Sequence, residues 1–195
     1  MKKYILLSFF TFYLITNCTK TPQKKITEKN TYVADNYSKK EVEIVMRDGA
    51  KLHTTIYSPK DTSKEYPILM QRTPYSSRPY GDGMKTNIGP NIHLMKEGNI
   101  IVYQDVRGRW MSEGVYDNMR AYIPNKKGKQ SDEVSDTYDT IDWLVKNVEN
   151  NNGNVGTWGI SYPGHYATIS AIDAHPALKA ASPQACIGDF FFDDF

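Results

Sequence analysis

Apolar and polar residues alternate along two neighbouring segments, residues 41–46 and 51–57, which is the pattern of half-buried β-strands. The four residues between them include Asp48 and Gly49, residue types that favour a tight turn. The two segments therefore predict an antiparallel hairpin, which ends at Pro59.

Two short apolar runs, residues 66–71 and 99–106, lack this alternation and predict strands that are buried on both faces. Between them, a short helix fits residues 91–97 and is closed by Gly98. A further strand is expected just before residue 161 and a last one at residues 177–185. A helix of small residues between these two is expected to run to about Ala174.

The clearest helical pattern covers residues 132–148. Val134, Tyr138, Ile141 and Val145 recur at helical spacing and form an apolar stripe, which Leu144 and Val148 extend. Asp132, Asp136 and Asp139 fall on the other side. We expect a solvated face there, not a metal or acid–base site, because acidic residues in the first turns also suit the helix dipole.

The predicted order is hairpin, strand, crossover, strand, helix, strand, helix, strand. This order indicates an α/β fold with a doubly wound, mostly parallel sheet and an antiparallel edge. Ligands in such sheets bind at the carboxyl ends of the strands, where Tyr75, Arg107 and Ser161 are expected to lie.

Residues 154–165 predict a strand, a sharp turn with Ser161 at its tip, and the start of a helix. A serine on such a turn exposes its hydroxyl beside the first amides of the helix. A side chain at Gly159 would crowd the turn, Gly164 lets the helix pack close to the strand, and Pro163 suits a first helical turn. Taken alone, a serine in an ordinary β–α turn explains the pattern equally well.

Residues 1–18 begin with Met1-Lys2-Lys3 and continue as a short apolar run that ends at Cys18, in the form of a secretory signal of the bacterial lipoprotein type. Asn17 departs from the small residue expected before a lipidated cysteine, so an uncleaved anchor or plain secretion are the alternatives. We expect an exported protein of the cell envelope, either lipid-anchored at Cys18 or periplasmic, and a flexible polar tether over residues 19–38.

The charge distribution excludes one class of partner. Residues 1–40 hold eight of the 24 basic residues but only two of the 22 acidic ones, so the remainder of the chain is net acidic. The basic charge lies on the tether, and nothing indicates nucleic-acid binding. With Cys18 acylated, Cys186 has no partner and is expected to be a small buried apolar residue.

Six motifs occur in order along the chain. They are residues 45–52, 72–75, 104–108 with 112–114, 139–144, 159–164 and 175–179. Together they resemble the α/β-hydrolases of the X-prolyl dipeptidyl peptidase superfamily, and most closely the α-amino acid ester hydrolases, glutaryl cephalosporin acylases and cocaine esterase. The resemblance covers about residues 39–195 and implies that this segment is the N-terminal part of an α/β-hydrolase catalytic domain.

The resemblance implies catalytic roles for three residues. Ser161 matches the nucleophile that forms an acyl-enzyme. The backbone N–H of Tyr162 and the hydroxyl of Tyr75 match the two donors to the oxyanion, each worth roughly 3 kcal/mol of barrier. The alternative for Tyr75 is a loop tyrosine that shields the core. Arg107 is expected to tie its loop together through salt bridges with acids such as Asp105, and not to touch substrate.

Asp194 lies in an aromatic and acidic segment where the ester hydrolases carry an Asp-Asp pair. The resemblance implies that its carboxylate helps to hold the α-ammonium group of the substrate. A solvated loop acid is an equal alternative.

A serine nucleophile needs a general base, usually histidine, and in this fold the base follows the nucleophile in the chain. Only four histidines are present, and none fits: His53, His93, His165 and His175. The sequence thus predicts the N-terminal part of a longer enzyme, inactive by itself.

The predicted function of the intact protein is that of a serine hydrolase acting on α-amino acid esters, β-lactam amides or short peptides. An X-prolyl dipeptidyl peptidase is the alternative enzyme, and a non-catalytic fragment or surface binding module is the alternative from another class. No cofactor or metal is expected. The expected partner is a small-molecule or short-peptide substrate; membrane contact is expected only through the lipid anchor, and homo-oligomerisation is left open.

Overall fold

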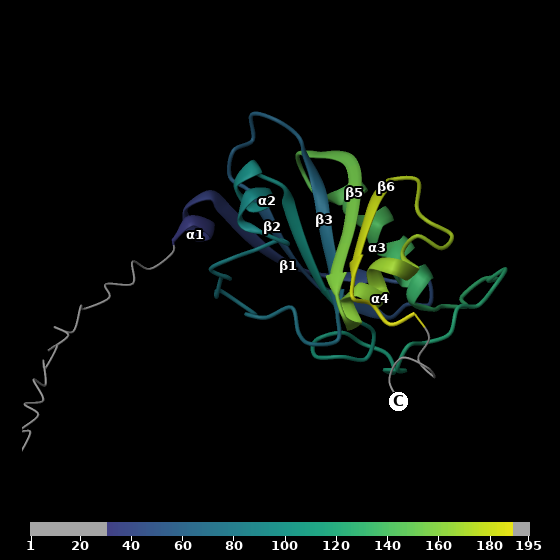
Figure 1. Ribbon diagram of the computed structural model, residues 1–195. Coiled ribbons are helices and arrows are strands. Elements are labelled where there is room, and N and C mark those ends of the chain that lie inside the picture. The colour runs from purple at the N-terminus through teal and green to yellow at the C-terminus, as the bar shows by residue number, and fades with distance from the viewer. Residues whose placement is uncertain (1–30, 189–195) are drawn as a thin grey trace, which may run out of the picture.

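The computed structural model describes residues 31–188, which form a six-stranded sheet with helices on both faces (Figure 1). The strands lie in the order β1-β2-β4-β3-β5-β6. In chain order the elements are α1 (Tyr32–Asn36), β1 (Tyr37–Val45), β2 (Lys51–Pro59), β3 (Tyr66–Thr73), α2 (Ile92–Glu97), β4 (Ile100–Asp105), α3 (Glu133–Asn147), β5 (Asn151–Ile160), α4 (Tyr162–Ile169) and β6 (Leu178–Gln184). The predicted signal segment with Cys18, and also Asp194, lie outside the described residues.

The strand directions confirm the predicted α/β fold. β1 pairs antiparallel with β2, and β2 pairs antiparallel with β4, whereas β4, β3, β5 and β6 run parallel to one another. The carboxyl ends of β3, β4 and β5 therefore meet at one edge of the sheet, the lower edge in Figure 1. This edge is where ligands bind in open α/β sheets.

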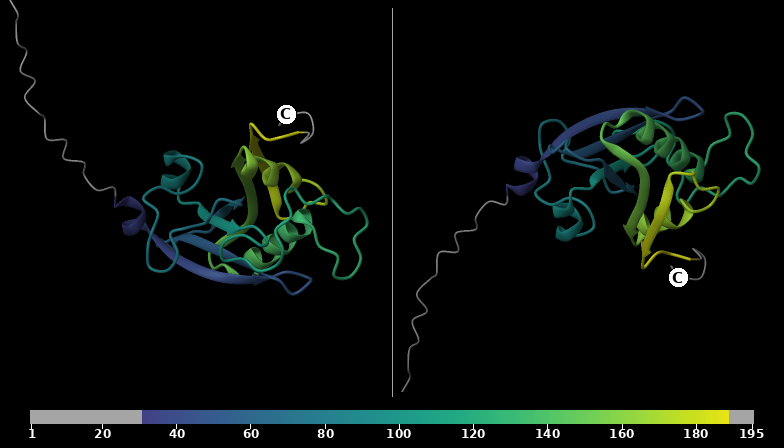
Figure 2. Two further views of the ribbon diagram at one scale, coloured as in Figure 1. Left: turned by 90° about the horizontal axis from the view of Figure 1, so that it is seen from below. Right: turned by 90° about the horizontal axis from the view of Figure 1, so that it is seen from above.

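Successive residues of the central strands pack on opposite faces of the sheet. Ile100 and Val102 of β4 lie in one core cluster with Ile141 of α3, and Ile101 lies in a second cluster with Met95 of α2. The two views in Figure 2 show α3 and α4 on one side of the sheet and α1 and α2 on the other. Burial on both faces explains why this strand reads as a continuous apolar run.

The predicted tether is wrong over residues 31–38. These residues form α1 and the start of β1, and the side chains of Val33 and Tyr37 are buried. The Tyr37 hydroxyl donates to the carbonyl of Met95, 2.6 Å away and 58 residues distant in sequence. Two apolar residues in a polar segment are too few to show a local period, so this tertiary contact was not predicted.

The helix predicted at residues 132–148 is present as α3. A capping box begins it, in which Asp132 accepts from the Ser135 backbone N–H while the Ser135 hydroxyl accepts from the Asp132 N–H. Among residues 31–188, no helix has the length and apolar character needed to span a bilayer.

The elbow helix α4 is shorter than predicted. It ends at Ile169 instead of Ala174, because the backbone N–H groups of Ala171 and Ile172 bond to carbonyls three residues back. The Ser170 hydroxyl also bonds to the carbonyl of Ala167 and to the Thr157 hydroxyl of β5. These tight bonds end the α-helical ladder and turn the chain toward β6.

Candidate active site

Ser161 lies on a strained turn between β5 and α4. Its backbone has φ 60° and ψ −123°, a conformation that L-residues rarely adopt and that persists only where the surroundings impose it. The Ser161 N–H donates to the carbonyl of Gln184 at 2.9 Å, which ties the turn to the end of β6. This geometry is the sharp strand-to-helix turn, with Ser161 at its tip, that the sequence predicted.

Both glycines of the elbow have the packing roles expected of them. A Cβ at Gly159 would lie 2.2 Å from the carbonyl carbon and oxygen of Pro163. A Cβ at Gly164 would lie 2.8 Å from the carbonyl oxygen of Gln184 and 3.1 Å from the Cβ of Cys186. The turn and the close approach of α4 to β6 therefore both require the absence of a side chain.

The Ser161 side chain is exposed, and within residues 31–188 its hydroxyl forms no hydrogen bond. It stands at the N-terminus of α4, where the first backbone N–H groups of a helix point outward. An exposed hydroxyl beside such donors is available for attack on a carbonyl group whose oxygen those donors stabilise.

Tyr75 lies beside the elbow although it is 86 residues earlier in the chain. It follows β3, which pairs in parallel with β5, so both strands deliver their carboxyl ends to the same edge. The rings of Tyr75 and Tyr162 meet edge to face, with centroids 6.2 Å apart, and Tyr75 is 61% exposed. The large exposed fraction argues against the alternative of a tyrosine that shields the core.

The side chain of Tyr162 is held by residues 116–119, a segment in which no site residue was predicted. Its hydroxyl bonds to the hydroxyl of Tyr116 at 2.8 Å, accepts from the Met119 N–H at 3.1 Å and donates to Asn118. Burial, reinforced by the bond to Tyr162, raises the pKa of Tyr116. The segment after β4 thus fixes the residue that follows Ser161.

Asp105 organises the loop that carries Tyr75. Its fully buried carboxylate accepts from the Ser77 N–H at 2.6 Å and from the Tyr80 hydroxyl at 2.8 Å. The carbonyl of Pro74 accepts from the indole N–H of Trp110 at 2.9 Å. Two loops, one after β3 and one after β4, are therefore joined on both sides of Tyr75.

Arg107 has the structural role predicted for it, but the predicted partner is wrong. Its guanidinium pairs with Asp136 of α3 and with Asp48 of the β1–β2 turn, each at 2.7 Å, and not with Asp105. These two carboxylates outweigh the effect of burial and raise the pKa of Arg107. The Asp105 carboxylate instead accepts hydrogen bonds from Ser77 and Tyr80, in the loop that follows Tyr75.

The predicted solvated face of α3 is also wrong at its N-terminal end. Asp132, Glu133 and Asp136 are all at least 97% buried, whereas Asp139 binds Arg47 at a partly exposed site. Arg72 of β3 pairs with Glu133 at 3.0 Å and lies over the ring of Tyr166 on α4. The arginines supply the compensating charge that lets these acids be buried.

The pKa values of two neighbouring buried acids, Asp132 and Glu133, shift in opposite directions. Desolvation raises the pKa of Glu133 despite the nearby Arg72 guanidinium. Desolvation acts in the same direction on Asp132, but two backbone N–H donors and the Lys126 ammonium outweigh it and lower the pKa of Asp132. The only signal of this cluster in the sequence is an arginine within the buried run of β3.

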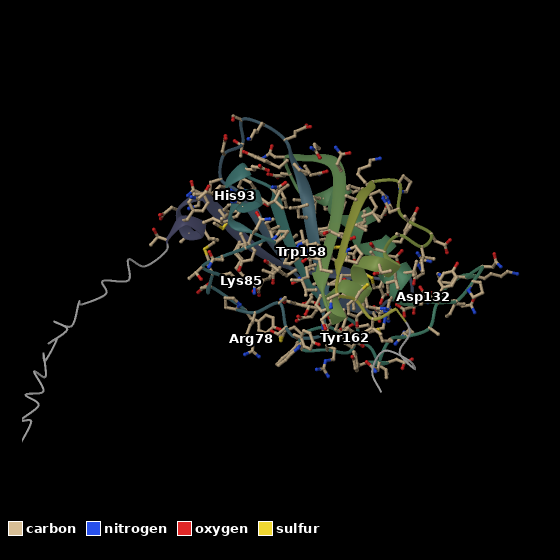
Figure 3. The ribbon with its side chains drawn as sticks, viewed as in Figure 1. Arg78, Lys85, His93, Asp132, Trp158 and Tyr162 are labelled. Carbon is tan, nitrogen blue, oxygen red and sulfur yellow. The ribbon has the colours of Figure 1, made fainter. Side chains whose placement is uncertain are left out.

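All four histidines lie within residues 31–188, and none of their rings is hydrogen-bonded to the Ser161 hydroxyl; the one bond from a histidine to Ser161 is from the backbone N–H of His165 to the Ser161 carbonyl, 3.1 Å away at the start of α4. His53 bonds to Glu43 in the hairpin, and His175 lies 3.5 Å from Asp142 near the start of β6. His165 packs on Tyr166, and burial lowers the pKa of His165. Figure 3 shows His93 far from Tyr162, the residue after Ser161.

Cys186 is partly buried, not fully as expected, and its sulfur accepts from the Thr168 hydroxyl. Residues 31–188 contain no group of three or more histidine, cysteine, aspartate or glutamate side chains placed to hold a metal ion. The candidate site in the described part of the chain brings Ser161 and Tyr162 together with Tyr75.

A model of the X-Pro dipeptidyl-peptidase family (S15) matches residues 48–194. The chain belongs to this family. Cocaine esterase from Rhodococcus sp. (strain MB1 Bresler) is 30% identical over 160 residues, which are 82% of this chain and 25% of that protein. Tyr75, Ser161 and Tyr162 all lie within the segment that the family model matches.

Two solved structures have a similar fold. An α-amino acid ester hydrolase has a TM-score of 0.70 and 37% identity, over 91% of this chain and 29% of that one. An aminopeptidase from a marine sediment thaumarchaeon has a TM-score of 0.70 and 38% identity, over 85% of this chain and 28% of that one. The chain spans about a quarter of the length of the curated relatives that it matches.

Proposed function

We propose that the protein that contains this chain is a serine hydrolase that forms an acyl-enzyme on Ser161. The observation that carries the proposal is the Ser161 backbone, with φ 60° at an exposed position at the N-terminus of α4. A strained turn is retained where it aims a side chain. The family assignment supports hydrolysis as the chemistry.

In the proposed reaction, the Ser161 oxygen attacks the carbonyl carbon of an ester or amide. The Tyr162 N–H and the Tyr75 hydroxyl donate to the oxygen that becomes negative, which stabilises the tetrahedral intermediate. The leaving alcohol or amine departs, and water then releases the acyl group from Ser161. The contact between the Tyr75 and Tyr162 rings supports the pairing of these two donors.

The proton of the Ser161 hydroxyl must pass to a general base. No histidine in residues 31–188 contacts that hydroxyl. The proposal therefore places the base outside the described residues.

We propose acyl compounds with a free α-amino group as substrates: α-amino acid esters, β-lactam amides or short peptides. The similarity to an α-amino acid ester hydrolase and to an aminopeptidase supports this class. The family description supports the alternative, an X-prolyl dipeptidyl peptidase. Arylamides of X-proline dipeptides and α-amino esters, compared at equal concentration, distinguish the two.

Asp194 is proposed to bind the α-ammonium group of these substrates. Asp194→Asn should raise KM for an α-amino ester and leave KM unchanged for the same ester without the amino group. An equal change for both esters would leave Asp194 as a solvated loop acid.

Export and lipid attachment at Cys18 are likewise proposed, on the N-terminal sequence pattern. Cells grown with an alkyne-tagged fatty acid should label the wild-type protein and not Cys18→Ala. Label retained in Cys18→Ala would contradict the assignment.

The catalytic proposal is tested with a fluorophosphonate probe on the native protein from its source cells. Such a probe forms a covalent bond with an activated serine, and mass mapping then gives the labelled residue. We expect a label on Ser161 that is lost in Ser161→Ala and kept in Ser63→Ala, which changes an exposed loop serine. A well-folded protein without the label would identify a non-catalytic fragment or binding module.

A further inference from the structure

The side-chain ammonium of Lys39 lies inside a ring of oxygen atoms. Its Nζ donates to the carbonyls of Pro79 at 2.6 Å, Gly81 at 2.7 Å and Gly83 at 2.8 Å. A carboxylate oxygen of Glu41 lies 2.6 Å away. The Lys39 side chain is only 6% exposed, so this ring encloses most of it.

The chemistry of this ring is that of a cation site. An ammonium group has three N–H donors, and the three carbonyls accept all of them. Glu41 adds a negative charge, because one of its carboxylate oxygens lies 2.6 Å from the ammonium nitrogen. Backbone carbonyls with a carboxylate are also the ligands that hard metal cations prefer.

The segment 79–83 needs a positive charge at this place. Its three carbonyl dipoles converge on one point, and without a cation they would repel one another. The other carboxylate oxygen of Glu41 accepts from the Gly81 N–H at 3.2 Å. The segment is therefore bonded to β1 both through its carbonyl groups, which accept from Lys39, and through an N–H group, which donates to Glu41.

This segment is connected to Tyr75 through Tyr80. Tyr80 lies between two of the residues whose carbonyls surround Lys39, and its hydroxyl bonds to Ser76 at 2.9 Å and to Asp105 at 2.8 Å. Ser76 follows Tyr75 directly and has a positive φ of 94°. A shift of residues 79–83 would therefore reach the neighbour of Tyr75 through the hydrogen bond between Tyr80 and Ser76.

We propose that Lys39 is a positioning residue whose ammonium acts as a tethered cation, filling the carbonyl ring of residues 79–83 and so holding the loop that carries Tyr75. The role of Lys39 as the cation that binds the carbonyls of residues 79–83 does not depend on whether the protein is an enzyme. Its effect on reaction rate rests on the function proposed above.

The test is rescue of Lys39→Ala by a soluble ammonium ion, in the full-length protein. We expect a lower Tm for Lys39→Ala than for wild type, and methylammonium chloride should raise the Tm of this variant alone. Lys40→Ala, which removes the exposed neighbour on β1, is the control. Tetramethylammonium at equal ionic strength has no N–H donors and should not rescue. Equal effects of the two salts, or of methylammonium on all three proteins, would overturn the proposal.

The catalytic consequence is measured with the same proteins and an α-amino ester. Displacement of an active-site group by about 1 Å costs up to about a hundredfold in rate, so Lys39→Ala should lower kcat by roughly tenfold or more, with methylammonium restoring it. Unrescued kcat with rescued Tm would leave Lys39 as a purely structural residue. A wild-type protein with no activity would contradict the proposed function, and the Tm rescue would still decide the cation role.

If Lys39→Ala does not fold, NMR of the wild-type protein with ¹⁵N-labelled lysine side chains tests whether the Lys39 ammonium is enclosed. An enclosed ammonium should give a resolved Nζ signal with slowly exchanging protons, absent from Lys39→Arg. Rapid exchange at every lysine would contradict the enclosed site.

Discussion

The α-carbon of Gly159 faces the carbonyl group of Pro163 so closely that an added Cβ would lie 2.2 Å from both of its atoms. These two residues stand on opposite sides of Ser161, one at the end of β5 and one in the first turn of α4. The sharpness of the turn at Ser161 therefore depends on a contact that only glycine permits.

We predict that Gly159→Ala destabilises the protein and removes any reactivity of Ser161. The methyl group meets backbone, which cannot move aside as a side chain can, so we expect a loss of about 2 kcal/mol or more in unfolding free energy. Gly156→Ala on the same strand is the control, because its Cβ would lie 3.1 Å from the tip of the Leu69 side chain and 3.8 Å, an ordinary contact distance, from the Ala180 carbonyl oxygen. Urea denaturation of both variants gives the comparison. Equal stability would show that the turn relaxes without cost.

Tyr75→Phe tests the proposed oxyanion donor. We expect kcat of the intact enzyme to fall by a factor on the order of a hundred, equivalent to about 3 kcal/mol, while the unfolding free energy changes little. Tyr122→Phe removes another tyrosine hydroxyl, which bonds to Asp173 at the surface, and should leave kcat unchanged. If the two variants lose kcat equally, Tyr75 has no specific role.

Arg107→Ala tests the buried ion pairs. Its loss leaves the fully buried Asp136 without its closest partner, and breaking such a pair costs about 3 to 5 kcal/mol. Lys146→Ala is the control, because its pair with Asp142 is exposed and worth roughly 0.5 kcal/mol. Thermal or urea unfolding separates the two values. Similar costs would mean that Asp136 finds water or another donor.

Stability should depend on pH through Asp132. Its pKa is lower in the folded than in the unfolded chain, so its ionised form stabilises the fold above the unfolded value, near 3.8. That contribution is lost as the pH falls through the folded pKa. We expect wild type to be more stable than Asp132→Asn at pH 7, with the difference shrinking below pH 4.

Lys126→Ala provides a second measurement of the same effect. It removes the ammonium 2.9 Å from Asp132 but leaves the two backbone donors, so the pH dependence should weaken without disappearing. A difference between wild type and Asp132→Asn that is constant with pH would contradict the lowered pKa.

The sequence by itself determined the fold and the elbow. Strands buried on both faces and the amphipathic helix α3 leave patterns within a few residues, and their order restricts the sheet topology. The glycines around Ser161 indicated the turn because their effect is local: each makes room for backbone close by in the chain or in the next strand.

Tertiary structure alone decided which charges are buried and with which partners. Asp132 and Asp136 occupy positions on α3 that the helical period assigns to solvent, yet Lys126 and Arg107 cover them. Lys39 directly follows the predicted tether, and its partners are about 40 residues away in the chain. Local periodicity reports the apolar faces of an element, because hydrophobic burial adds over many positions. A buried ion pair is a single contact between distant residues, so it leaves no period in the sequence.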